Sequence, residues 1–215
     1  MATGKTRRRR RLDPIGVLIR DGRLFVDLPP GLGLRASPEA FWKLCAANRD
    51  LRLERSPTGR VIVMPPAGSE SGEQNFELAG QLYLWIRATG LGRGFDSSAG
   101  FTMPDGAVLG PDLAWFAPGR WEAVPDEARR KFASICPDFV VELRSPSDRQ
   151  PKLRRKMHRY LSYGVRLAWL IDPIAKAVEV YRPGREPEVL DRPASLSGEG
   201  VLPGFALDLR GILGE

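Results

Sequence analysis

The stretch of sequence that decides the fold is residues 137–148, PDFVVELRSPSD. Its apolar centre is short, rich in valine and bounded by prolines, which is typical of a buried β-strand over residues 139–143. Glu142 lies inside this strand, where burial of a carboxylate is costly unless a cation or metal ion compensates it. A second short apolar run, residues 113–116, follows Asp112. Two acids at two buried strands predict a metal site.

The positions of these acids favour a particular ion. Alternation along residues 138–144 puts Glu142 and Arg144 on one face of the strand, and Asp112 is placed to reach across an adjacent strand toward Glu142. Mg²⁺ (or Mn²⁺) uses few protein carboxylates and keeps waters and substrate phosphate oxygens as its other ligands. Such an ion polarises a phosphodiester and lowers the pKa of the attacking water. The metal candidates are therefore Asp112 and Glu142.

A catalytic cation is expected beside this metal. Residues 151–163 predict a helix that ends at Gly164, and its apolar stripe consists of Leu153, Met157, Tyr160 and Leu161. Lys156 lies about 80° to one side of the stripe, near enough to reach over the sheet. Arg144 is a second cation that stabilises charge without acting as a base. Two alternatives stay open: Glu142 and Arg144 form a buried ion pair, or Lys156 is a solvated helix residue.

The rest of the chain predicts an α+β fold. Further helices are expected over residues 38–48, opened by Ser37, and over residues 71–89, ending at Gly90. The remaining strands are predicted at residues 15–19 and 24–28 around Asp21-Gly22, 51–54, 61–64, 95–102, 167–171 and 177–181. Strand, helix and strand follow one another over residues 139–171, so we expect a mixed sheet flanked by helices, with N-terminal hairpin additions.

Three smaller expectations concern side chains near the acids. Within the helix of residues 71–89, Asn75 falls on the apolar stripe and should point inward, whereas Glu73 and Glu77 should be solvated. Asp148 is predicted to cap the helix that follows it, with a substrate contact as the alternative. Cys45 and Cys136 are too far apart in the sequence, and too isolated from histidine, to indicate a zinc site or a disulfide framework.

Composition limits the class of protein. The chain has 215 residues, 42% of them hydrophobic, which predicts one domain over residues 13–215 after a disordered basic tail over residues 1–12. The net charge of +7 favours a polyanionic partner such as DNA or RNA, although the tail alone could simply be solubilising. No apolar run approaches the roughly 18 residues of a membrane helix, so we expect a soluble, cytoplasmic protein without a membrane partner.

An ordered series of motifs carries a family resemblance. It comprises Pro111-Asp112, residues 137–142 and 145–148, Lys156-Met157, Tyr160, Gly164, residues 169–173 (WLIDP), 178–181 (VEVY) and 202–205 (LPGF). In these motifs the chain resembles the Uma family of putative restriction endonucleases, a branch of the PD-(D/E)xK nuclease superfamily. The resemblance covers residues 37–209, and the ordered series is far more specific than any single Pro-Asp pair.

The resemblance implies a restriction-endonuclease-like core and metal-dependent hydrolysis of DNA phosphodiester bonds. Asp112 would match the aspartate of the superfamily motif and Glu142 the second acid. Arg144 lies where the superfamily usually has lysine. Lys156, on the following helix, would supply the function of that lysine. The alternative is a catalytically inactive nuclease-fold protein that only binds nucleic acid. A homodimer follows by analogy with other nucleases of this fold.

Overall fold

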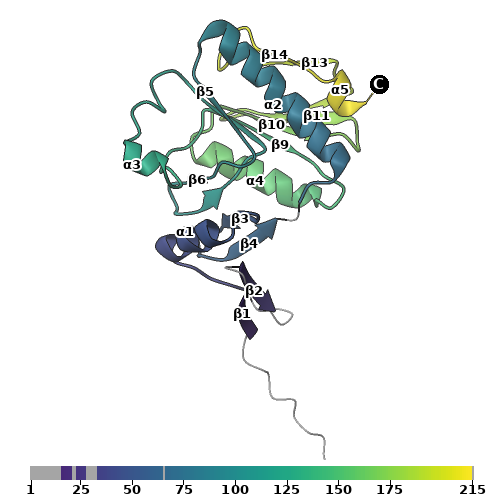
Figure 1. Ribbon diagram of the computed structural model, residues 1–215. Coiled ribbons are helices and arrows are strands. Elements are labelled where there is room, and N and C mark those ends of the chain that lie inside the picture. The colour runs from purple at the N-terminus through teal and green to yellow at the C-terminus, as the bar shows by residue number, and fades with distance from the viewer. Residues whose placement is uncertain (1–15, 21–22, 28–32, 65, 215) are drawn as a thin grey trace, which may run out of the picture.

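The computed structural model describes residues 16–20, 23–27, 33–64 and 66–214 (Figure 1). The predicted basic tail, residues 1–12, and the predicted turn Asp21-Gly22 lie outside the described residues. The N-terminal hairpin is confirmed, because β1 (Gly16–Arg20) pairs antiparallel with β2 (Arg23–Asp27). No helix in the described part of the chain is both long enough and apolar enough to cross a membrane.

A mixed six-stranded sheet forms the centre of the fold, as predicted. Its order is β12 (Glu188–Asp191), β11 (Ala177–Tyr181), β10 (Leu167–Asp172), β9 (Phe139–Leu143), β8 (Leu113–Phe116) and β5 (Arg93–Asp96). Strands β9 and β10 are parallel, and the other neighbours are antiparallel. The helix α4 (Gln150–Ser162) connects the parallel pair, which confirms the strand, helix, strand unit.

Two helices cover the two faces of this sheet (Figure 1). The helix α2 (Ser69–Thr89) ends at Gly90, whose φ of 71° is the left-handed conformation of a helix cap. Its Leu78 and Leu82 pack in one buried cluster with Trp115 and Val141. On the opposite face, the buried residues of α4 pack in a second cluster with alternate residues of β8, β9 and β10. Alternate residues of a strand point to the same face of a sheet, so Glu142, two residues after Val140 in β9, points toward α4 as Val140 does.

A second sheet of four strands lies beside the first. Its order is β4 (Val61–Met64), β3 (Arg52–Arg55), β7 (Val108–Leu109) and β6 (Phe101–Thr102). The hairpin of β3 and β4 is confirmed, as is the helix α1 (Pro38–Ala47), where the Ser37 hydroxyl accepts a hydrogen bond from the Ala40 N–H at 3.2 Å. This sheet brings a short charged strand, β3, to the edge of the larger sheet.

One predicted strand is wrong. Residues 95–102 form two strands in different sheets, β5 and β6, rather than one. The Asp96 carboxylate accepts hydrogen bonds from the N–H and hydroxyl of Ser98, which turns the chain after β5. Gly100 then passes the Phe132 ring so closely that a Cβ at this position would lie 2.9 Å from it. The local turn therefore outweighs the apolar character of the stretch.

The C-terminal segment supports α2 from outside. Strands β13 (Ser195–Ser197) and β14 (Ala206–Asp208) form a small hairpin, followed by the short helix α5 (Arg210–Leu213). The Gln81 side chain bonds both backbone groups of Asp208, donating to its carbonyl at 2.9 Å and accepting from its N–H at 2.7 Å. A further single-turn helix, α3 (Asp126–Arg129), lies in the connection between β8 and β9.

Candidate active site

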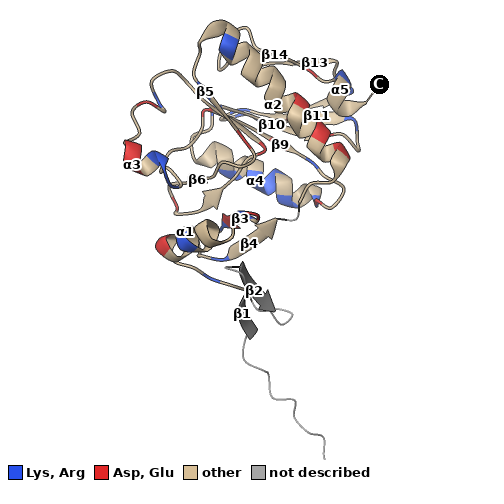
Figure 2. Ribbon diagram, in the orientation of Figure 1, with Lys and Arg blue, Asp and Glu red and all other residues tan. Residues whose placement is uncertain are grey.

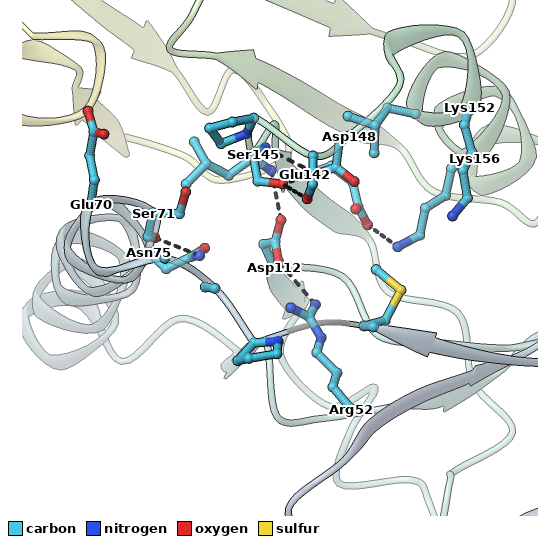
Figure 3. A pocket seen from close by; sticks show the side chains of 18 of the residues that line it. Arg52, Glu70, Ser71, Asn75, Asp112, Glu142, Ser145, Asp148, Lys152 and Lys156 are labelled. Carbon is cyan, nitrogen blue, oxygen red and sulfur yellow. Dashed lines mark hydrogen bonds and ion pairs between the residues drawn. The ribbon is translucent and has the colours of Figure 1, made fainter. Parts of the chain in front are cut away.

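A cavity of about 470 Å³ opens where α2 and α4 meet the edges of both sheets. Figure 3 shows its charged and polar side chains. They come from β3, the first turns of α2, the start of β8, the end of β9, the loop of residues 145–148 and α4. Segments far apart in sequence thus supply one group of charged residues.

Asp112 and Glu142 are brought together by strand register. Leu113 pairs with Val141 in the antiparallel β8–β9 ladder, so one step further along the ladder Asp112 lies opposite Glu142. Residues opposite each other in such a ladder have Cβ atoms about 4.5–5.5 Å apart. The Asp112 Oδ2 accepts a hydrogen bond from the Leu143 N–H at 2.8 Å, which holds this carboxylate over the end of β9 (Figure 3).

Glu142 is buried, with only 4% of its surface exposed. Its Oε1 accepts a hydrogen bond from the Tyr160 hydroxyl at 2.9 Å and lies 2.8 Å from the Lys156 Nζ. Burial raises the pKa of Glu142 to about 7; the Lys156 ammonium opposes this rise, and the nearby carboxylates of Asp112 and Glu54 add to it. Glu142 therefore accepts a proton far more readily than an ordinary glutamate.

Lys156 bridges two acids. Its Nζ lies 2.8 Å from Glu142 and 2.8 Å from Glu54 of β3. Burial alone would lower the pKa of Lys156, but these two carboxylates raise it above its ordinary value, so the ammonium stays charged. For the Glu54 carboxylate, burial acts in the opposite direction and raises the pKa. The Lys156 ammonium and the Gly110 N–H, which donates at 3.2 Å, outweigh burial, so the pKa of Glu54 lies below its ordinary value.

The charges of this cluster do not balance. Arg52 donates to Asp112 at 3.0 Å and also bonds the Gly110 carbonyl at 2.9 Å. Together with Lys156 it supplies two positive charges, against three carboxylates from Glu54, Asp112 and Glu142. The net charge of minus one adds to burial, the main cause, in raising the pKa of Glu142. Because buried ion pairs of this kind rarely stabilise a fold as well as apolar residues do, their presence in a cavity indicates a functional site.

The donor set fits a hard divalent cation. The two facing carboxylates of Asp112 and Glu142 are ligands that Mg²⁺ prefers, and the cavity beside them has room for waters. Asn75 donates to the Ser71 carbonyl at 2.9 Å, but its own Oδ1 is buried without a hydrogen-bond partner and belongs to the same cavity. Over the described ranges, no three or more His, Cys, Asp or Glu side chains are grouped to hold a metal by themselves. A two-carboxylate site completed by waters is thus the arrangement that fits.

Not every predicted residue reaches the cavity. The structure brings Asp112, Glu142 and Lys156 together, and Asn75 points inward as expected. Arg144 does not line this cavity, because Asp172, in register with it on the parallel strand β10, forms a 2.7 Å ion pair with its guanidinium. The alternative of a buried ion pair between Glu142 and Arg144 is wrong, because Glu142 pairs with Lys156 instead.

The predicted helix cap at Asp148 is wrong. The residue at the N-cap of α4 is Arg149, and no side chain bonds the free N–H groups there. Asp148 instead closes the loop before the helix, where its Oδ2 accepts from the Ser145 N–H at 3.0 Å and from the Ser145 hydroxyl at 2.7 Å. Because the Asp148 carboxylate bonds the hydroxyl and the backbone N–H of Ser145, it does not cap α4.

Three contributors to the site were missed by sequence reasoning. Arg52 and Glu54 alternate along β3, and two charges on one face of a hairpin strand are typical of a solvent-exposed face. The hydroxyl of Tyr160 was missed because the residue lies on the apolar stripe of α4. Glu54 is buried and contacts Lys156 of α4, 102 residues away in sequence, so no local signal could have identified it.

Comparison with known proteins gives a consistent result. The family model described as "Uma2: Putative restriction endonuclease" matches residues 38–210. A crystal structure of a putative nuclease belonging to DUF820 from Anabaena variabilis ATCC 29413 aligns with a TM-score of 0.68 and 25% identity, covering 83% of this chain and 97% of that one. No curated protein matches the chain. The range of the family match includes every cavity residue named above.

Proposed function

Since the chain belongs to the Uma2 family of putative restriction endonucleases, we propose that it is a metal-dependent endonuclease that hydrolyses the phosphodiester bonds of DNA. Its restriction-endonuclease-like fold and the structural likeness to a putative nuclease support nuclease function in general. The divalent metal, the DNA substrate and the roles of individual residues are the further content of the proposal.

One observation carries this proposal. Asp112 and Glu142 lie opposite each other in the β8–β9 ladder, and a protonated lysine contacts one of them. Three carboxylates and two cations leave one negative charge, which a divalent cation would offset. This arrangement supports Mg²⁺ or Mn²⁺ as the cofactor, held by Asp112 and Glu142, with the Asn75 amide oxygen close to the same cavity. Such an ion supplies polarisation of the phosphodiester and an acidified water.

The protein residues have distinct roles in this proposal. The Lys156 ammonium keeps its proton, so it stabilises negative charge on the phosphoryl oxygens and orients water by donating hydrogen bonds, but it is not the general base. Glu54 positions Lys156 through their 2.8 Å contact. Arg52 and the Leu143 N–H fix the two oxygens of Asp112 in one orientation. Arg144, paired with Asp172, has no catalytic part in this scheme.

Plasmid cleavage tests the proposal directly. Wild-type protein should nick supercoiled plasmid in the presence of Mg²⁺ or Mn²⁺ and not in EDTA. The variants Asp112→Asn, Glu142→Gln and Lys156→Gln should each lose at least about 100-fold in rate, the scale on which removal of one transition-state contact acts. Glu73→Gln, an exposed substitution on α2, is the matched control and should cut at the wild-type rate.

The alternative is a nuclease-fold protein that binds nucleic acid without cutting it. That alternative predicts salt-dependent DNA binding by the wild type with no cleavage in any divalent metal. It was suggested by arginine at position 144, and the contact of Lys156 with Glu142 weighs against it. Two further predictions are a cytoplasmic location and a homodimer. A homodimer would bring two sites to the two strands of a duplex.

A further inference from the structure

Three exposed cations follow one another at intervals of three residues next to the candidate active site: Arg149 at the N-cap of α4, and Lys152 and Arg155 in its first two turns. We propose that these three residues, called here the α4 basic strip, bind consecutive backbone phosphates of the DNA beside the bond to be cut. This inference rests on the proposed DNA substrate and adds the surface along which the DNA lies.

The α4 basic strip has no acidic partner among the described residues. All three side chains are exposed, and within the described residues none of them forms an ion pair or a side-chain hydrogen bond. In contrast, many arginines elsewhere are paired with acids; examples are Arg120 with Asp138, Arg182 with Glu199 and Arg210 with Asp208. The strip is thus a local excess of positive charge.

The position of the strip is unfavourable for the helix itself. Arg149 and Lys152 lie at the N-terminal turn of α4, where the helix dipole disfavours positive charge. Like charges three residues apart on a helix also repel each other. The first turn of α4 has no acidic residue and no side-chain cap to balance this positive charge, and its Lys152 N–H already donates to the Arg149 carbonyl. A phosphate group would offset all of these costs at once.

The location of the strip joins it to the active site. Lys152 lines the active-site cavity and also an adjoining shallow hollow that Arg149 and Arg155 line. Figure 3 shows Lys152 beside Lys156 on the same helix, and Figure 2 shows the basic bands along α4. Arg149 and Arg155 are separated by six residues, about 9 Å of helix. That length spans two to three phosphates of one strand, at about 3.4 Å of duplex axis for each.

The geometry therefore assigns a path to the DNA. One phosphate lies in the cavity at Asp112, Glu142 and Lys156, and the neighbouring phosphates of the same strand lie along the strip. No side chain of the strip reaches a base edge in this arrangement, so its contribution is independent of base sequence. Its loss should weaken binding equally for all duplex sequences and raise the DNA concentration needed for half-maximal cleavage.

The salt dependence of DNA binding tests this inference without requiring cleavage. Affinity for a fluorescent duplex of 30 base pairs would be measured by anisotropy in EDTA between 50 and 200 mM KCl, for the full chain. The triple variant Arg149→Gln, Lys152→Gln, Arg155→Gln should lower the magnitude of the log-affinity against log-salt slope by about 2.7, since each phosphate contact contributes about 0.9. The affinity ratio between the two salt concentrations then shrinks about 40-fold.

A second triple variant, Arg130→Gln, Arg185→Gln, Arg192→Gln, removes the same charge from exposed positions outside α4. Its slope should stay near the wild-type value, and both variants should keep the wild-type circular dichroism spectrum and melting temperature within a few degrees. Equal loss of slope in both variants, or no loss in either, would overturn the strip while leaving the proposed nuclease intact. Absence of salt-dependent duplex binding by the wild type would instead remove the DNA substrate and the strip together.

Discussion

The substitution Glu142→Gln should stabilise the metal-free protein at alkaline pH. Glu142 is the buried carboxylate that gives the cluster its uncompensated negative charge, and Gln keeps its shape while removing that charge. Tyr160 can still donate its hydrogen bond to the amide oxygen, and Lys156 keeps its contact with Glu54. The variant therefore lacks the charge repulsion and retains most of the contacts.

The size of the effect follows from the raised pKa. Burial raises the pKa of Glu142 from its ordinary value of 4.5 to about 7 in the folded chain. The native state then binds more protons than the unfolded state between these values, so the free energy of unfolding falls as the pH rises through this window. The difference of about 2.5 pKa units corresponds to about 3 kcal/mol, fully lost above pH 7. At pH 5 the wild-type side chain is mostly protonated, and Gln should gain almost nothing.

The assay is urea unfolding in EDTA at pH 5 and pH 8, followed by tryptophan fluorescence. Glu142→Gln should exceed the wild type by about 2–3 kcal/mol at pH 8 and match it within about 1 kcal/mol at pH 5. Glu73→Gln, an exposed control on α2, should match the wild type at both pH values. At pH 8, Mg²⁺ at about 1,000 times its Kd should make the wild type the more stable of the two, since it stabilises the wild type by about 4.1 kcal/mol.

A Glu142→Gln variant that is less stable than the wild type by the same amount at both pH values would refute this reasoning. Such a result would mean that the ion pair with Lys156 stabilises the fold and that the cluster carries no excess charge. If Glu142→Gln stayed more stable than the wild type in Mg²⁺, that result would separately refute the role of Glu142 as a metal ligand.

Two further substitutions test the fold and the site. Gly92→Ala should destabilise the fold by more than about 3 kcal/mol in urea unfolding, because Gly92 has a φ of +71° and an added Cβ would lie 2.1 Å from the Phe116 carbonyl oxygen. Gly90→Ala is the control, since Gly90 has the same φ but open space around it, and it should lose only about 1 kcal/mol. Tyr160→Phe removes the hydroxyl that donates to Glu142 and favours its ionised form. Calorimetric titration should therefore show weaker Mn²⁺ binding at pH 7 and a higher midpoint in the pH dependence of Mn²⁺ affinity; an unmoved midpoint would contradict this.

Local sequence signals predicted most of the framework. Helix α2 was bounded within two residues because its left-handed Gly90 ends it, and α4 within one residue because its apolar stripe is clear. The facing of Asp112 and Glu142 was foreseeable because both acids interrupt short apolar strands that belong to one sheet. Such features depend on neighbours in sequence or on strand alternation, both of which can be read directly.

The rest depended on contacts between distant segments. The partner of Arg144 is Asp172, and this pairing follows from the parallel register of β9 with β10, which sequence alone does not fix. Glu54 joined the site only because the four-stranded sheet docks near α4, where Lys156 can reach it. The Ser97 to Gly100 turn, which divides β5 from β6, had local signals, but the apolar residues around it masked them.

Binding of a single divalent ion tests the central claim most directly. Calorimetric titration of Mn²⁺ at pH 8 should give one ion for each wild-type chain, with binding lost in Asp112→Asn and retained in Glu73→Gln. At pH 7 the same titration should release a fraction of a proton from Glu142, measurable from the dependence of the heat on buffer. A wild type that binds no ion, or an Asp112→Asn variant that binds Mn²⁺ as tightly as the wild type, would contradict a metal site between Asp112 and Glu142.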